Sequence, residues 1–175
     1  MKDYKGLLLF LAIFVSSCAA PAPTPTPKPA AEPASPEVFL KLHLKADPEL
    51  NLHGGKGHAL HLCVYQLIDA NAFRQLSEDE GGLYKLMNCD RFDAGVALAR
   101  RLVIQPGEDR IFELDEAEGV KYVGIVAGYY ALQKKHCVRL YPVQTVEEKK
   151  GGQVVYRPMP IKTDLILGPQ GIRNP

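Results

Sequence analysis

Three histidines and one cysteine that lie close together in the sequence have side chains able to bind a metal ion. They are His53, His58, His61 and Cys63. Neutral imidazoles and a thiolate are ligands of zinc and copper, and a loop can bring them together around one ion. Their spacing matches no established metal site. The sequence therefore predicts no metal and no other cofactor, and it favours surface histidines that form hydrogen bonds with a partner.

Cys18 is the residue whose covalent chemistry the sequence indicates most clearly. It ends the segment VSSC at residues 15–18, which closes an apolar run that begins at residue 6. This run is too short to cross a hydrocarbon core of about 30 Å, as is typical of a secretory signal. A branched apolar residue, two small residues and a cysteine form the pattern at which bacterial lipoproteins are acylated and cleaved. Residues 1–17 are thus predicted to be a lipoprotein signal peptide and Cys18 the lipidated N-terminus.

The segment after Cys18 is rich in proline. Seven prolines occur between residues 19 and 37, mostly next to alanine and threonine. Proline lacks the amide donor that a helix or a strand ladder needs. We expect residues 18–37 to form an extended tether that reaches roughly 60 Å at most, at about 3.1 Å per residue in polyproline II. Ala19 follows the cysteine where an aspartate would favour the inner membrane, so the predicted location is the periplasmic face of the outer membrane.

The charge and length of the chain narrow the functional classes. The formal net charge is +1 at pH 7, and no run of basic residues stands out. The sequence therefore indicates neither nucleic acid nor a strongly acidic partner, and it indicates no small-molecule substrate. Residues 38–175 suffice for one domain with its own hydrophobic core.

The apolar residues of this domain recur mainly at every second position, which is typical of β-strands. The segment 122–130 has no polar residue for a wet face and is predicted to be a central strand covered on both sides. These patterns predict a mainly β fold, a two-sheet β-sandwich with a small inserted helical segment, and a barrel is the alternative. Strands are predicted at residues 38–46, 59–67, 96–104, 110–114, 122–130, 137–143, 153–157 and 161–167, and short helices within 70–94.

Three cysteines of the predicted domain can supply one internal disulfide in the oxidising periplasm, from three possible pairings. We prefer Cys89 with Cys137 because both flank turns, whereas Cys63 lies within a strand and is expected to be a small core residue. His61 lies near Cys63, and His136 directly precedes Cys137. A thiol hydrolase is therefore an alternative function, although no orienting acid is identifiable.

Tyr129 and Tyr130 offer a further candidate surface. Two tyrosines can stack on sugar rings, as in an unrelated periplasmic lipoprotein that binds sugar or peptidoglycan. Paired tyrosines at the end of a strand are more typical of one core residue and its exposed neighbour. We therefore expect no site here.

Six short motifs follow one another in a recognisable order. They are ADPELN at residues 46–51, VYQL at 64–67, Phe73, LY at 83–84, LVIQPG at 102–107 and YVGIVA at 122–127. Together with the cysteine segment and the tether, this order resembles the outer-membrane lipoproteins of type VI secretion systems, the TssJ family. The resemblance covers residues 38–132 and is weaker up to residue 167.

The resemblance implies a transthyretin-like sandwich and a non-enzymatic role in the membrane complex of a contractile injection machine. Members of the family bind the periplasmic C-terminal domain of a large inner-membrane protein and tie it to the outer membrane. Their principal contact is the loop between the first two strands. In this sequence that loop comprises Asn51, Leu52, His53, Gly54, Gly55, Lys56, Gly57 and His58.

Overall fold

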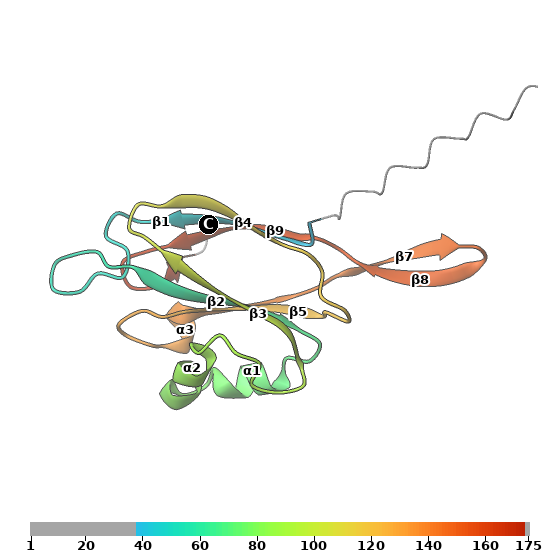
Figure 1. Cartoon of the computed structure of the whole chain (residues 1–175), viewed down its shortest axis with the longest axis horizontal. Coiled ribbons are helices and arrows are strands. Elements are labelled where there is room, and N and C mark those ends of the chain that lie inside the picture. Colours follow the sequence, from blue (N-terminus) through green and yellow to red (C-terminus); the bar gives the residue numbers. More distant parts are fainter. Residues whose placement is uncertain (1–37, 174–175) are drawn as a thin grey trace, which may run out of the picture. The chain divides into compact units, whose positions relative to one another are not determined.

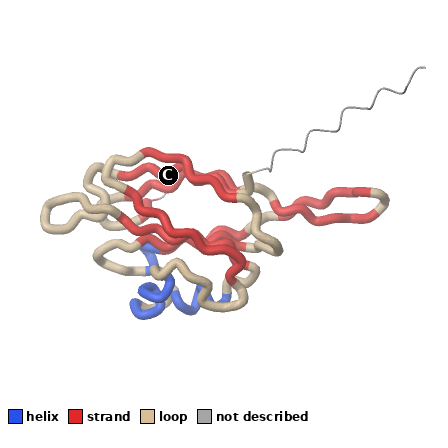
Figure 2. The backbone as a smooth tube through the Cα atoms, viewed as in Figure 1, coloured by secondary structure: helices blue, strands red, loops and turns tan. Residues whose placement is uncertain are grey.

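The computed structural model describes residues 38–173. Two four-stranded sheets form a sandwich in this part of the chain (Figures 1 and 2). The mainly β sandwich predicted from the sequence is confirmed. The predicted signal peptide, Cys18 and the tether lie outside the described residues.

The first sheet has the strand order β10-β9-β1-β4, and the second has the order β3-β2-β5-β6. β1 lies between a parallel neighbour, β9, and an antiparallel one, β4. The bounds of the first sheet are β1 Leu40–Ala46, β4 Asp109–Leu114, β9 Ile161–Leu167 and β10 Ile172–Arg173. Those of the second are β2 Leu60–Leu67, β3 Val96–Ile104, β5 Tyr122–Ala127 and β6 Val138–Pro142.

The main core lies between the two sheets. Alternate residues of β1 supply fully buried leucines to it, Leu40, Leu42 and Leu44. Leu62 and Ile125 meet them from the second sheet. The alternation of the sequence therefore places one face of β1 on this core and leaves its other face half-buried.

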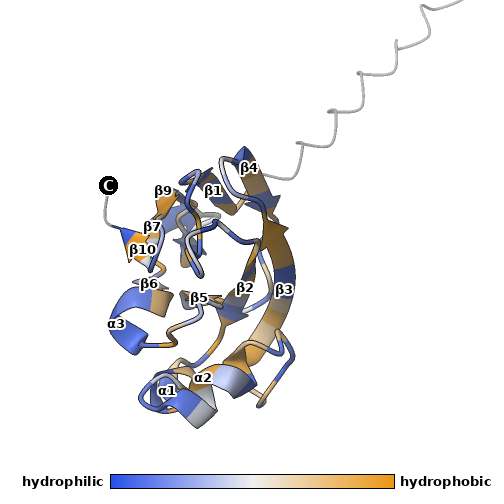
Figure 3. Ribbon diagram, turned by 90° about the vertical axis from the view of Figure 1, so that its left-hand side faces the viewer, coloured by the Kyte–Doolittle hydropathy of each residue, from blue (hydrophilic) through white to orange (hydrophobic). Residues whose placement is uncertain are grey.

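A second core covers the opposite face of the second sheet. It is closed by the helices α1 (Asn71–Leu76) and α2 (Glu80–Leu86), which pack against β2 and β5 (Figure 3). The ring of Phe73 packs directly against Gly124. A Cβ atom at residue 124 would lie 2.7 Å from this ring. The prediction of a central strand covered on both sides is thus confirmed for Tyr122–Ala127.

The predicted disulfide between Cys89 and Cys137 is wrong. Cys63 pairs with Cys89, at a Cα–Cα distance of 5.2 Å. Cys63 is indeed buried, but its side chain faces the second core, where the turn after α2 brings Cys89 over β2. Cys137 lies in the main core as a buried free cysteine, so the two turns that seemed equivalent in the sequence lie in different layers.

Several elements differ from the sequence prediction. The strand predicted at 122–130 ends at Ala127, and a short helix, α3 (Lys134–Cys137), precedes β6. β7 (Thr145–Lys150) was not predicted and pairs with β8 (Gln153–Pro158) in a separate two-stranded sheet (Figure 1). The described side chains of β7 are exposed to solvent. Its sequence therefore lacks the alternation of apolar and polar residues from which the other strands were predicted. No helix among residues 38–173 is long and apolar enough to span a membrane.

Replacing both Cys63 and Cys89 by alanine is expected to lower the free energy of unfolding by about 3 kcal/mol, since the bridge restrains the unfolded chain. The two cysteines are 26 positions apart in the sequence. Urea denaturation measures the change. Peptide mapping without reduction should recover Cys63 linked to Cys89, with Cys137 alkylated only after unfolding. A peptide linking Cys89 to Cys137 would contradict this structure.

Candidate functional site

The loop between β1 and β2 contains two buried residues ahead of its tip. Leu50 is fully buried in the main core, and Asn51 is 5% exposed. The backbone of Asn51 has a φ of 50°, a left-handed conformation that asparagine tolerates better than most residues. Of the eight residues predicted to contact a partner, Asn51 is therefore the buried anchor of the loop.

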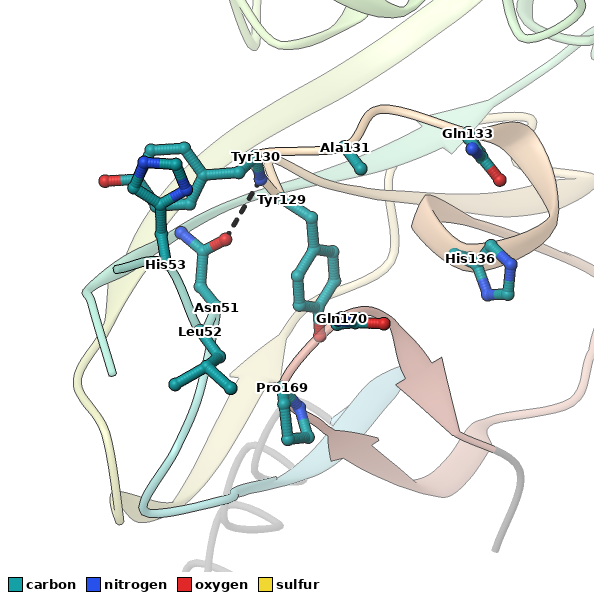
Figure 4. Close-up of a pocket in the computed structure, with 10 residues that line it drawn as sticks. All are labelled: Asn51, Leu52, His53, Tyr129, Tyr130, Ala131, Gln133, His136, Pro169 and Gln170. Atoms are coloured by element: carbon teal, nitrogen blue, oxygen red, sulfur yellow. Dashed lines mark hydrogen bonds between the residues drawn. The ribbon is translucent and has the colours of Figure 1, made fainter. Parts of the chain in front are cut away.

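The side chain of Asn51 connects two loops that are far apart in the sequence. Its oxygen accepts a hydrogen bond of 3.0 Å from the backbone N–H of Tyr130, and its amide donates to the carbonyl of Ala59 at 3.3 Å. The first bond joins positions 79 residues apart. One buried amide thus fixes the base of the β1–β2 loop against the segment that follows β5 (Figure 4).

The tip of the loop is a miniature hairpin. The backbones of His53 and Lys56 exchange hydrogen bonds of 3.0 and 3.1 Å. Gly54 and Gly55 make the turn with φ values of 57° and 75°, which glycine adopts without strain. All four residues are exposed. The tip therefore has a defined conformation while being free to contact another molecule.

Two histidines of the loop pack around one tyrosine. The ring of His53 stacks on Tyr130 with a centroid distance of 4.1 Å and an interplanar angle of 19°. His58 meets the same ring edge-on at 5.5 Å, and its Nε2 lies 3.1 Å from the carbonyl oxygen of His53. These contacts hold the loop against Tyr130 in addition to the bond from Asn51.

A pocket of about 490 Å³ opens beside this aromatic cluster. It is formed by three loops that come together at one end of the sandwich, with residues 51–53, 129–136 and 169–170 contributing side chains (Figure 4). The backbone N–H of Leu52 donates to the carbonyl of Pro169 at 2.8 Å and joins the first loop to the third. None of the ten described lining residues is aspartate, glutamate, lysine or arginine.

The two tyrosines behave as the sequence predicts, one buried and one exposed. Tyr129 is 3% exposed, and Tyr130 is 57% exposed. Burial raises the pKa of the Tyr129 phenol well above its ordinary value, and the nearby backbone of Gly168 opposes part of this rise. Tyr130 also borders the pocket, and the expectation that the two tyrosines form no binding site stays a prediction.

The candidate ligands and nucleophiles of the sequence do not assemble into one centre. No group of three His, Cys, Asp or Glu residues suited to a metal ion occurs in the described part of the chain. Cys63 is held in the disulfide and offers no thiol to His61. Burial raises the pKa of the Cys137 thiol, which lowers the thiolate fraction that nucleophilic attack requires.

Sequence reasoning missed several pocket residues, among them Gln133, His136 and Gln170. Gln133 and Gln170 are exposed polar residues outside the helices and strands, and His136 is exposed on the short helix α3. Their proximity depends on the pairing of β9 with β1 and on the path of the chain from β5 into α3. The sequence singled out Tyr129 and Tyr130 as a pair, and the family resemblance supplied the pocket residues Asn51, Leu52 and His53.

The sequence pattern of the family described as type VI secretion lipoprotein, with the members VasD, EvfM and TssJ, matches residues 39–164. The chain belongs to this family. The matched region includes the whole β1–β2 loop and both tyrosines of the pocket. The resemblance inferred from the six motifs is thereby confirmed. None of the curated proteins compared with this lipoprotein shows a significant match.

Solved structures support the fold of this lipoprotein. TssJ1 from Pseudomonas aeruginosa is 22% identical, with a TM-score of 0.57 over 77% of this chain and 92% of its own. Serratia marcescens Lip, a membrane-bound component of the type VI secretion system, is 17% identical, with a TM-score of 0.58 over 77% and 94%. A structure described as the TssM C-terminal domain from EAEC is 14% identical, with a TM-score of 0.56 over 77% and 94%.

Replacing Asn51 by alanine is expected to lower the free energy of unfolding by about 1–3 kcal/mol, since it leaves the backbone N–H of Tyr130 without its acceptor. Asn51→Gly separates the causes, because glycine keeps the positive φ but loses both hydrogen bonds. Urea denaturation measures both variants. The exposed Asn88 provides the control, and Asn88→Ala should stay within about 0.5 kcal/mol of the unmodified protein. Equal losses for Asn51→Ala and Asn88→Ala would contradict the anchoring role.

Proposed function

We propose that this protein is an outer-membrane lipoprotein of the type VI secretion membrane complex and binds the periplasmic C-terminal domain of the large inner-membrane subunit. The observation that carries the proposal is the β1–β2 loop, a hairpin tip with exposed residues from His53 to Lys56 on a buried base. A preordered tip loses little conformational entropy on binding, which suits a protein contact. Membership of the secretion lipoprotein family supports this assignment.

The partner is proposed on the same basis. Two similar structures are described as the TssM C-terminal domain and as the type VI membrane complex. Those descriptions concern other proteins, and their likeness to this chain is one of fold. They are consistent with a partner in the membrane complex, which the β1–β2 loop would contact.

The anchor is proposed from the sequence. Cys18 would carry the lipid, and residues 19–37 would connect it to the sandwich that begins at residue 38. An N-terminus that carries three acyl chains is sufficient for stable attachment, because each buried methylene contributes about 0.8 kcal/mol. In this proposal the protein links the outer membrane to the inner-membrane subunit and catalyses no reaction.

A bulky group at the tip of the loop is expected to block binding. Lys56→Cys, modified with a polyethylene glycol maleimide, places such a group at an exposed position, whereas the buried Cys137 is protected from the reagent. The modified lipoprotein should bind the purified C-terminal domain of the inner-membrane subunit at least about tenfold more weakly, a loss of about 1.4 kcal/mol. Surface plasmon resonance measures the affinity.

The matched control carries the same group at Lys162, an exposed residue of β9 in the first sheet. Lys162→Cys with the same modification should bind like the unmodified lipoprotein. If modification at residue 56 leaves the affinity unchanged, the loop is not the contact. If the unmodified lipoprotein fails to bind the domain at all, the proposed function itself is wrong.

Cys18→Ser is expected to leave the fold intact and to abolish type VI secretion, because serine offers no thiol for acylation. Membrane fractionation should find the variant in the soluble periplasmic fraction, and circular dichroism should match the unmodified protein. Ser17→Ala keeps a small residue before the cysteine and should preserve both lipidation and secretion. Normal secretion in a strain that carries only Cys18→Ser would overturn the linking role.

A further inference from the structure

Tyr130 separates two hollows at the loop end of the sandwich. The first is the pocket of about 490 Å³ described above, and the second has a volume of about 360 Å³ and extends toward Tyr84 and Met87 of the helical layer. Both hollows are lined by Asn51, Tyr129 and Tyr130. An exposed aromatic side chain between two concave surfaces has the geometry of an interface anchor.

The position of Tyr130 is fixed before any partner binds. Its backbone N–H is held by Asn51, and one face of its ring is covered by His53 at 4.1 Å. The edge contact with His58 restricts the ring further. A side chain restrained in this way loses little entropy on binding, so its burial by a partner contributes more to affinity than burial of a free tyrosine would.

The walls of the two hollows consist of apolar side chains, neutral polar groups and histidines. The first combines the apolar side chains of Leu52, Ala131 and Pro169 with neutral polar groups, and the second includes Met87 and Leu132. None of the described residues that line either hollow is aspartate, glutamate, lysine or arginine. A charged occupant would lose its hydration without meeting a carboxylate, ammonium or guanidinium group in the described lining. An uncharged occupant loses much less hydration.

We propose that Tyr130 is the central anchor of the partner interface and that the two hollows beside it bind uncharged aromatic or branched aliphatic side chains of the protein partner. The site is continuous with the β1–β2 loop, because Asn51, Leu52 and His53 belong to both. This inference rests on the proposed function and adds the chemistry of the group that is recognised.

A glycan fits these surfaces less well than a protein side chain does. Sugar rings bind to an open aromatic face, and His53 already covers one face of Tyr130. The apolar walls formed by Leu52, Pro169 and Met87 match aliphatic or aromatic groups better than hydroxyl groups. The structure therefore favours a protein occupant.

Tyr130→Ala is expected to weaken binding of the purified inner-membrane C-terminal domain by at least about tenfold, as is typical of an interface hot spot. Tyr156→Ala is the matched control, because Tyr156 is 64% exposed on the β7–β8 hairpin and Tyr130 is 57% exposed. The control should bind like the unmodified lipoprotein. Ala131→Glu places a charge at an exposed position of the first hollow and should weaken binding to a similar extent.

The chemistry of the occupant is tested by the salt dependence of the affinity. Salt does not screen contacts between uncharged groups. The contribution of Tyr130 is the Kd of Tyr130→Ala divided by the Kd of the unmodified lipoprotein. This ratio should be the same at low and high salt. Thermal denaturation of each variant confirms that it is folded. A ratio that falls to one at high salt would mean a charged occupant and would overturn the proposal.

The remaining outcomes separate this inference from the proposed function. If the modification at residue 56 blocks binding and neither Tyr130→Ala nor Ala131→Glu does, the loop contact stands and the inference about the hollows is wrong. If Tyr130→Ala leaves partner binding intact but prevents sedimentation of the lipoprotein with purified peptidoglycan, the occupant is a glycan and the inference is also wrong. Failure of the unmodified lipoprotein to bind the partner contradicts the proposed function.

Discussion

The second sheet depends on being covered on both faces. Every side chain from Leu62 to Leu67 in β2 is buried, and alternate residues belong to different cores. The first sheet covers one face, while α1 and α2 cover the other, with the Cys63–Cys89 bridge joining the helical layer to β2. Because close packing occupies both faces of the central strands, these strands cannot offer side chains to a partner. The loops at the strand ends are where such contacts are available.

The loop end of the sandwich acts as one preordered unit because a few polar contacts join segments that are distant in the sequence. Asn51 holds Tyr130, Leu52 is bonded to Pro169, and His53 stacks on the tyrosine ring. Each contact is modest, since a single hydrogen bond contributes about 1 kcal/mol net. Together they fix three loops in one arrangement, so shape and uncharged chemistry, and not loop flexibility, determine what this surface can bind.

The sequence predicts most of the sandwich because its core strands carry the period-two pattern of burial, as in Leu40–Ala46. It does not predict β7, whose described side chains are exposed, or the partner of Cys89, which depends on the layer that each turn covers. The order of motifs locates the β1–β2 loop through the family. The meeting of His53 with Tyr130 could not be predicted, because no local pattern specifies which loops come together across the end of a sandwich.

The central position of β1 has a mechanical consequence. The described chain begins just before β1, and the β1–β2 loop follows its other end, so tension between a membrane anchor and a partner on the loop would run along this strand. β1 is hydrogen-bonded to β9 on one side and to β4 on the other. Force along β1 loads the hydrogen bonds on both sides, perpendicular to the strand toward β4 and slanted toward β9, in shear. These bonds share the force, instead of breaking one after another as in an unzipped edge strand. The sandwich is therefore built to resist stretching along the direction in which a link between two membranes would be pulled.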